Sequence, residues 1–380
     1  MLLTLTNAPR DYAWGSTTLL AELQGRTPSG APEAEVWFGD HPGDPAELPD
    51  GRTLDEVTGG SLPYLLKLLA AGAPLSIQVH PTRAQAREGY ARESALDPAD
   101  PARNYRDDNH KPELIVALSD TFEALSGLRP VSQTLRLLAS FPESAGVAEL
   151  RRRLGAGTST DAEAEALRDT IGWLLSGRAR AAVADIVAGL AATDAEGFDD
   201  ALDAIRGIAR RNPADPGVVV ALLMNFVVLR PGEAIFLRAG LLHAYVSGLG
   251  VEIMAASDNV LRGGLTSKHI DVDELLAIVD TRPAEVPVQR RGGAATVYDV
   301  PVPDFALRRL EPAGDQTVTV TGPAIVLATA GEVAVSGADA RRLPIPVGEA
   351  VFATADETRL TLHGHGEVFI AEPGRDGTGR

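Results

Sequence analysis

The sequence has no cysteine among its 380 residues. Disulfide bonds, thiolate metal ligands and cysteine nucleophiles are therefore excluded. Basic residues are also scarce: 35 Lys and Arg stand against 52 Asp and Glu, giving a formal net charge of −17. A nucleic acid or an anionic membrane needs a basic surface that this charge would oppose, so we expect neither as a partner. An anion that binds here must be held by local Lys or Arg side chains.

The chain also lacks a hydrophobic run long enough to cross a bilayer. Its longest apolar stretch begins at Val218 and reaches Val228, but Asn225 interrupts it, and a membrane helix needs about 20 apolar residues. Residues 1–15 contain no basic region followed by an apolar core, so no export signal is expected. With 44% hydrophobic residues, the composition favours a soluble, cytoplasmic protein of two or three domains.

The spacing of apolar, Gly and Pro residues changes twice along the chain. Residues 1–130 consist of short apolar segments between Gly and Pro, which predicts mainly β structure. Residues 131–215 carry apolar side chains at helical spacing and charged residues typical of a solvated face, which predicts a helical insertion. Residues 217–228 are expected to form one more buried helix. We therefore expect a first domain of residues 1–130 plus 216–275, the insertion, and a C-terminal β domain of residues 276–380.

A short phrase occurs twice and indicates two related β-modules. Gly232-Glu-Ala-Ile-Phe236 is echoed by Gly348-Glu-Ala-Val-Phe352, each closely after a proline and each opening a predicted strand. The last hundred residues alternate polar and apolar side chains in many short segments, as in a β-sandwich or jelly roll. The expected fold class is mainly β with a helical insertion.

The stretch LSIQVHPT, residues 75–82, contains two polar side chains in an apparently buried strand. Because residues i and i+2 of a strand share a face, Gln78 and His80 should project together while Ile77 and Val79 pack on the other side. A buried amide and imidazole need a partner, since each costs several kcal/mol if left unsatisfied. That partner could be a metal ion or simply a hydrogen bond within the core.

Two further segments supply ligands of the same kind. Glu113 ends the phrase DDNHKPE just before the apolar strand LIVAL, and His243 follows a turn in AGLLHAY. Together with Gln78 and His80 they make a set of two nitrogen and two oxygen ligands suited to Zn²⁺. Only one ligand is anionic, so the site keeps surplus positive charge that would polarise a bound carbonyl or alkoxide.

A second polar cluster begins at Glu252 and continues through the phrase SDNVLRGGLTSK. Arg262 offers a planar guanidinium and Lys268 a point charge, and both suit a phosphate. The alternative is structural: Arg262 could pair with Asp258, four residues earlier, on a helical turn.

Six blocks in this order resemble the type I mannose-6-phosphate isomerase family: YAWG at 12–15, AEVWFGDHP at 34–42, PLSIQVHP, DNHKPEL, GLLHAY and MAASDNVLRGGLTSKHIDV. The resemblance implies cupin-type jelly-roll barrels with a helical insertion and one Zn²⁺ per chain. It also implies interconversion of mannose 6-phosphate and fructose 6-phosphate through a cis-enediol(ate). The sequence departs from the family pattern at Ser267, where proline is common, and at Asp40, where a small residue is usual.

The resemblance assigns roles to individual residues. The implied metal ligands are Gln78, His80, Glu113 and His243. The implied catalytic residues are Arg262, Lys111 and His110. The implied substrate-binding residues are Lys268, Ser76, Trp14, Lys67, Tyr245, Glu252 and Asp258.

Several alternatives stay open at the level of the sequence. By residue type, His110, Lys111, Glu252 and Asp258 could each act as the base, and either Arg262 or Lys268 could hold the phosphate. A non-catalytic sugar-phosphate-binding cupin and an iron-dependent cupin oxygenase are the competing functions. His363 and His365 form a His-x-His pair without an obvious carboxylate partner, and a second metal site there is the alternative left open. The oligomeric state is open, and a monomer is compatible with the sequence.

Overall fold

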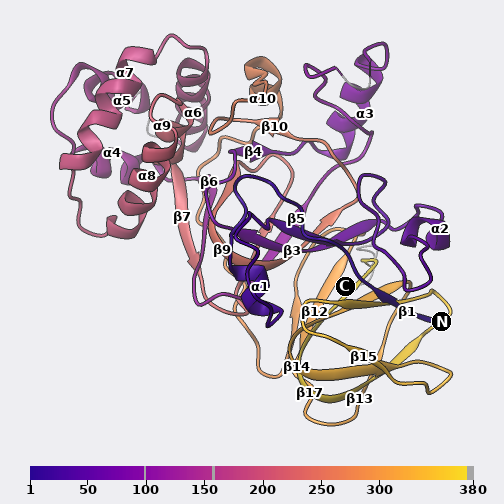
Figure 1. The fold of residues 1–380 in the computed structure, drawn as a ribbon. Coiled ribbons are helices and arrows are strands. Elements are labelled where there is room, and N and C mark those ends of the chain that lie inside the picture. Colours follow the sequence, from indigo (N-terminus) through magenta and orange to yellow (C-terminus); the bar gives the residue numbers. More distant parts are fainter. Residues whose placement is uncertain (98–99, 156–158, 375–380) are drawn as a thin grey trace.

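The computed structural model describes residues 1–97, 100–155 and 159–374. Two antiparallel β-sheets lie side by side, and a group of helices stands at the far end of the first sheet (Figure 1). This arrangement confirms the expected class, mainly β with two β-modules and a helical segment. Within the described ranges, no helix combines the length and apolar character needed to cross a bilayer.

The first sheet is built around β9 (His243–Ala255), which pairs with four other strands. β9 turns at Gly248, whose φ is +118°. A Cβ there would lie 2.8 Å from the carbonyl oxygen of Thr121, so the turn needs glycine. The other strands of the sheet are β2 (Glu35–Phe38), β3 (Tyr64–Ala71), β4 (Gln78–Val79), β5 (Glu113–Ala117), β6 (Phe122–Leu128), β7 (Met224–Leu229), β8 (Ala234–Leu237) and β10 (Leu261–Arg262).

The second sheet joins the C-terminal strands to the start of the chain, because β1 (Leu2–Leu5) pairs with β16 (Ala350–Ala353). The repeated phrase occupies equivalent turns: Gly232 before β8 and Gly348 before β16 have φ of +82° and +83°. The remaining strands are β11 (Ala295–Tyr298), β12 (Ala306–Leu310), β13 (Gln316–Thr319), β14 (Ala324–Ser336), β15 (Leu343–Ile345) and β17 (Arg359–Glu372).

The helical segment leaves the first sheet after β6 and returns to it at β7, its hydrogen-bonded neighbour. Its apolar faces pack into one core that also includes Val79 of β4 and Ile77, which directly precedes this strand. The segment contains α4 (Val131–Leu138), α5 (Ala145–Leu154), α6 (Thr160–Leu175), α7 (Arg180–Gly189), η1 (Leu190–Ala192), α8 (Asp199–Arg211) and α9 (Gly217–Leu222).

The expectation of a helix over residues 217–228 is wrong in its second half. The helix ends at Leu222, and residues 224–229 form β7 instead. An apolar run of this length does not distinguish helix from strand by periodicity, and pairing with β6 decides the outcome.

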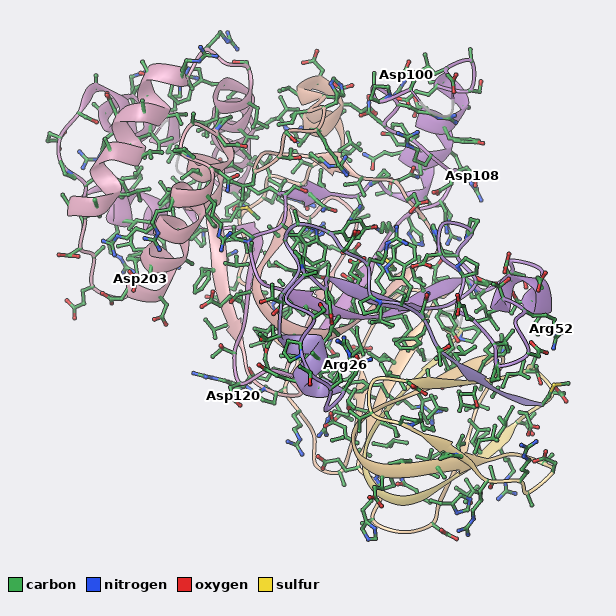
Figure 2. The ribbon with its side chains drawn as sticks, viewed as in Figure 1. Arg26, Arg52, Asp100, Asp108, Asp120 and Asp203 are labelled. Carbon is green, nitrogen blue, oxygen red and sulfur yellow. The ribbon has the colours of Figure 1, made fainter. Side chains whose placement is uncertain are left out.

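Four further helices lie outside the helical segment among the described residues, and charged side chains cover the outside of the molecule (Figure 2). Figure 2 shows Asp120 and Asp203 projecting outward from the ribbon. Both of these carboxylates are exposed to solvent. The helices are α1 (Leu19–Leu23), α2 (Leu54–Thr58), α3 (Arg83–Arg92) and α10 (Val272–Ile278).

Candidate metal centre and active site

Three ligand-type side chains converge at one end of the first sheet. His80 directly follows β4, Glu113 opens β5 and His243 opens β9. Their ligand atoms all lie within 4.8 Å of one another. His80 Nε2 is 3.2 Å from one oxygen of Glu113, and His243 Nε2 is 3.3 Å from the other. Two imidazoles and a carboxylate in this arrangement match the nitrogen and oxygen ligands that Zn²⁺ takes.

Backbone carbonyls orient both imidazoles toward Glu113. His80 Nδ1 lies 2.7 Å from the carbonyl oxygen of Asn259, and His243 Nδ1 lies 3.0 Å from that of Leu241. A carbonyl only accepts, so each Nδ1 carries the proton and each Nε2 presents a lone pair to the cluster. This second contact fixes the tautomer that a metal requires.

The chemistry of the cluster fits a cation between these groups. His80 Nε2 is buried and has no hydrogen-bond partner in the described chain. Burial lowers the pKa of His80 to about 4, so the ring is neutral at pH 7. Burial disfavours the ionised form of Glu113, yet its pKa is held well below the usual value, and the Lys111 ammonium 3.3 Å away favours the charge. Lone pairs that face one another across a buried site are satisfied by a bound metal ion.

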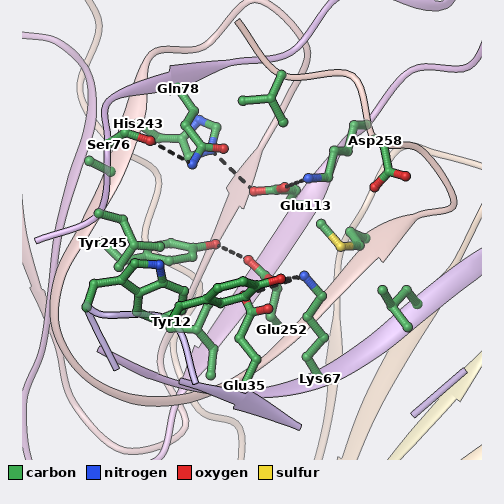
Figure 3. Close-up of a pocket in the computed structure, with 18 of the residues that line it drawn as sticks. Tyr12, Glu35, Lys67, Ser76, Gln78, Glu113, His243, Tyr245, Glu252 and Asp258 are labelled. Carbon is green, nitrogen blue, oxygen red and sulfur yellow. Dashed lines mark hydrogen bonds and ion pairs between the residues drawn. The ribbon is translucent and has the colours of Figure 1, made fainter. Parts of the chain in front are cut away.

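Gln78 stands beside this cluster, as Figure 3 shows. Its backbone pairs with His243 on one side and with Arg262 on the other. Its amide nitrogen lies 3.2 Å from the hydroxyl oxygen of Ser76, to which it donates. Ile77 and Val79, on the opposite face, are completely buried. The strand therefore packs with its apolar side and presents polar side chains to the cavity.

Glu113 and His243 of this cluster, together with Gln78, line a cavity of about 460 Å³, a volume typical of small-molecule sites. His80 lies buried behind them. Arg262 and Lys268 line this cavity and form no ion pair with a carboxylate of the described residues. Burial lowers the pKa of Arg262, with a further contribution from Arg106. Burial also lowers the pKa of Lys268, and the positive charge of Arg262 lowers it further. Asp258 instead contacts His41 at 3.1 Å, so the alternative pairing of Asp258 with Arg262 does not occur.

A buried network of charged groups forms the opposite wall. In the register of β2, β3 and β9, Trp37 lies opposite Lys67, and Lys67 lies opposite Glu252. Lys67 Nζ is 3.4 Å from a carboxylate oxygen of Glu252 and 3.6 Å from one of Glu35. The same ammonium lies 4.8 Å from the centre of the Trp37 ring, close enough for a cation–π contact. One cation thus joins two carboxylates and an aromatic face.

Hydrogen bonds from ring donors fix the two carboxylates of this network. The Tyr245 hydroxyl donates to Glu252 at 2.8 Å, and Trp37 Nε1 donates to Glu35 at 2.7 Å (Figure 3 shows the first). Burial opposes the charge of Lys67, but Glu35 and Glu252 raise its pKa above the usual value. Burial also raises the pKa of Glu252, against the attraction of Lys67. Lys67 and the two carboxylates are therefore coupled: each charged form is favoured by the opposite charge beside it.

The other expected site residues divide between the cavity and its surroundings. Trp14 and Ser76 line the cavity, and Trp14 stacks on Tyr12 with ring centres 5.7 Å apart. Lys111 also lines it, with Nζ 3.3 Å from an oxygen of Glu113. His110 does not join them. Its Nε2 lies 2.8 Å from a carboxylate oxygen of Asp304, outside the cavity lining.

Two other residues noted in the sequence, His363 and Asp40, have hydrogen-bond partners in the structure. His363 Nδ1 lies 2.8 Å from Asp315, and its Nε2 lies 2.8 Å from the Ser336 hydroxyl. Among the described residues, the one group of three or more His, Asp or Glu gathered for a metal is the cluster around Glu113. Asp40 accepts hydrogen bonds from the Thr58 hydroxyl and the Leu62 amide, which explains its burial.

Glu35 and Trp37 belong to the cavity wall although the sequence analysis gave them no role. The sequence shows only that Glu35 stands beside the apolar residues Val36, Trp37 and Phe38. The structure adds that all four residues of this strand are buried, and a buried carboxylate needs a partner.

Comparison with known proteins gives a consistent result. The family model described as phosphomannose isomerase type I, catalytic domain, matches residues 2–131. The mannose-6-phosphate isomerase of Escherichia coli is 37% identical over 96% of this chain and 97% of its own length. That of Rattus norvegicus is 30% identical over 92% of this chain and 93% of its own.

Solved structures agree with the sequence relatives. A crystal structure of a mannose 6-phosphate isomerase bound with zinc and yttrium superposes with a TM-score of 0.87. It is 33% identical and covers 98% of this chain and 100% of its own. The apo form from Salmonella typhimurium also gives a TM-score of 0.87 at 33% identity, over 98% of this chain and 99% of its own. The chain therefore belongs to the type I phosphomannose isomerase family.

Proposed function

We propose that this chain is a zinc-dependent isomerase that interconverts mannose 6-phosphate and fructose 6-phosphate. The observation that carries the proposal is the convergence of His80, Glu113 and His243, with lone pairs aimed at a common point. The cluster borders a cavity that is also lined by two unpaired cations, Arg262 and Lys268. A metal and a phosphate are the two things that a sugar-phosphate isomerase of this family must bind. The relatives named above carry that activity in their names.

The metal is proposed to be one Zn²⁺ per chain, held by Gln78, His80, Glu113 and His243. The buried His80 Nε2 without a partner and the two carbonyl-oriented imidazoles support this ligand set. A bound zinc ion supplies Lewis-acid polarisation of the sugar oxygens at the reacting carbons.

The reaction moves a proton between C1 and C2 of the open-chain sugar and develops negative charge on an enediolate oxygen. We propose that Lys111, whose Nζ borders the metal cluster, carries the proton. Arg262 then lies on the same side of the cavity as Gln78 and opposes the developing negative charge. Lys268, near the mouth and more exposed, binds the phosphate.

The remaining cavity residues position these groups. Lys67 and Glu252 hold the opposite wall in one geometry, and Tyr245 anchors Glu252. Trp14, Ser76 and Asp258 contact the sugar from the rim. His110 takes no part in this scheme, since its ring is engaged with Asp304.

A coupled assay that follows mannose 6-phosphate to fructose 6-phosphate, with and without a chelator, tests the proposal. Turnover that is lost on chelation and restored by Zn²⁺ supports it. Binding of the sugar phosphate without turnover would indicate a non-catalytic cupin, and oxygen consumption would indicate an oxygenase. Neither alternative is favoured, because the family is one of isomerases and Gln78 borders the position that an oxygenase would leave open.

A further inference from the structure

A second cavity, of about 410 Å³, lies where the helical segment meets the first sheet. Arg129, at the end of β6, and Gln133, on α4, form one side, and Asn225 and Phe226 of β7 form another. Residues 197–201, at the start of α8, close it. It shares no lining residue with the active-site cavity.

Arg129 is the unusual residue of this cavity. It is 4% exposed, and one of its terminal nitrogens, Nη2, donates to the carbonyl oxygen of Met224 at 2.9 Å. The other, Nη1, is buried and has no hydrogen-bond partner in the described chain. The guanidinium carbons of Arg129 and Arg136 each lie 5.1 Å from the centre of the Phe198 ring. Two cations are therefore held against one aromatic side chain.

No carboxylate of the described residues forms an ion pair with Arg129. Burial, followed by the charge of Arg136, lowers the pKa of Arg129 to about 10. Proteins seldom keep a buried charge unpaired, because the missing partner leaves the desolvation cost uncompensated. Asp199 and Asp200 line the same cavity but are exposed to solvent and lie beyond ion-pair distance of Arg129. An anion from outside the chain would complete the site.

The first turn of α8 already carries two carboxylates, Asp199 and Asp200, which complement the partial positive charge of its free amide groups. The case for an external anion therefore rests on the unpaired guanidinium of Arg129.

We propose that this cavity binds a small hydroxylated oxyanion, whose phosphate or carboxylate group contacts Arg129. The side chains of Gln133 and Asn225 and the carboxylates of Asp199 and Asp200 supply hydrogen-bonding groups for the hydroxyls of such a ligand. The volume accommodates a molecule larger than a bare inorganic anion. The ligand is thus chemically related to the proposed substrate but binds at a separate place.

Thermal unfolding in the presence of defined anions tests the proposal. The background protein carries Arg262→Met and Lys268→Ala, which remove the two cations of the active-site cavity that form no ion pair with a carboxylate of the described residues. Glycerol 3-phosphate and glycerate are the two probes, titrated at constant ionic strength, and they distinguish a phosphate ligand from a carboxylate one. We expect at least one of them to raise the unfolding midpoint by about 1–3 °C at concentrations well above its dissociation constant.

The matched variants are Arg129→Met and Arg210→Met, added separately to this background. Arg210 is an exposed arginine of α8 that does not line the cavity. The rise should persist with Arg210→Met and disappear with Arg129→Met. An equal rise in both variants, or no rise in the background protein with either probe, would overturn the proposal.

A further variant covers the case in which Arg129→Met does not fold. Gln133→Glu places an acidic group of the chain itself in the cavity, where it competes with an external anion for Arg129. We expect it to abolish the rise, and an undiminished rise would contradict the proposal. Because the background protein lacks two of the residues proposed for isomerisation, the result does not depend on whether the chain is an isomerase.

Discussion

Replacing Lys67 by methionine tests the buried network of the cavity wall. The substitution keeps an apolar side chain of similar length but removes the cation that lies 3.4 Å from Glu252 and 3.6 Å from Glu35. Each contact is worth about 5 kcal/mol of Coulomb energy at an effective dielectric constant of about 20, and desolvation offsets much of it. Breaking a buried ion pair by removing one partner costs about 3–5 kcal/mol. We expect the free energy of unfolding at neutral pH to fall by that amount.

The loss should depend on pH in a defined direction. Without Lys67, two buried carboxylates face each other, and the pKa of Glu252, which burial already raises, moves further above its usual value. A carboxyl group whose pKa is raised in the folded state favours folding while it is protonated, and that contribution is lost as the pH rises through the raised pKa. The deficit of the variant relative to the wild type should therefore be smallest near pH 5 and largest near pH 8.

Urea unfolding of the zinc-loaded proteins, followed by circular dichroism, measures both effects. The matched control is the double variant Lys67→Met with Glu35→Gln, which removes one of the two unpaired charges. It should recover part of the lost stability, because Trp37 can still donate to the amide oxygen. If the free energy of unfolding of Lys67→Met is within about 1 kcal/mol of the wild-type value at every pH, the three charges are not a buried, coupled network.

Three other predictions concern the active site. His80→Ala or His243→Ala should strip the protein of most of its zinc after dialysis, as measured by plasma mass spectrometry, and full retention would contradict the ligand set. Lys111→Met should lower isomerase turnover by about 10²-fold or more with zinc content unchanged, and near-normal turnover would remove it from the mechanism. Lys268→Ala deletes a charge-assisted contact worth about 1.5–3 kcal/mol, so kcat/KM should fall about 10- to 100-fold, mainly through KM; an unaltered KM would refute the phosphate role.

The part of the metal cluster that lies on β4 could be predicted, because the pattern that places it is local. Alternation along a strand places Gln78 and His80 on one face, and the opposite residues Ile77 and Val79 are fully buried, as that pattern requires. The repeated Gly-Glu-Ala phrase likewise predicts two β-modules from the sequence alone, and its two glycines adopt the same positive φ. The domain limits drawn from the sequence stay a prediction, as does the cytoplasmic location.

The charged wall could not be read from the sequence in the same way. Trp37, Lys67 and Glu252 meet because three strands distant in sequence pair in one register. A shift of one residue would turn each side chain to the opposite face, and no local pattern specifies that register across such distances. Glu35 therefore received no role, although it lies within the block AEVWFGDHP that resembles the family.

His110 shows a different limit of sequence reasoning. It adjoins Lys111 in the phrase DNHKPE, so both were expected at the site. Successive residues of an extended segment point to opposite sides. Lys111 accordingly faces the metal cluster, while His110 faces Asp304.

The most direct test of the account is an anomalous diffraction map of the protein crystallised with zinc and measured at the zinc absorption edge. We expect one strong peak per chain, about 2.0–2.2 Å from His80 Nε2, His243 Nε2 and a carboxylate oxygen of Glu113. Gln78 should supply its amide oxygen to the same ion. A catalytically active crystal whose zinc peak lies away from these atoms would contradict the assignment.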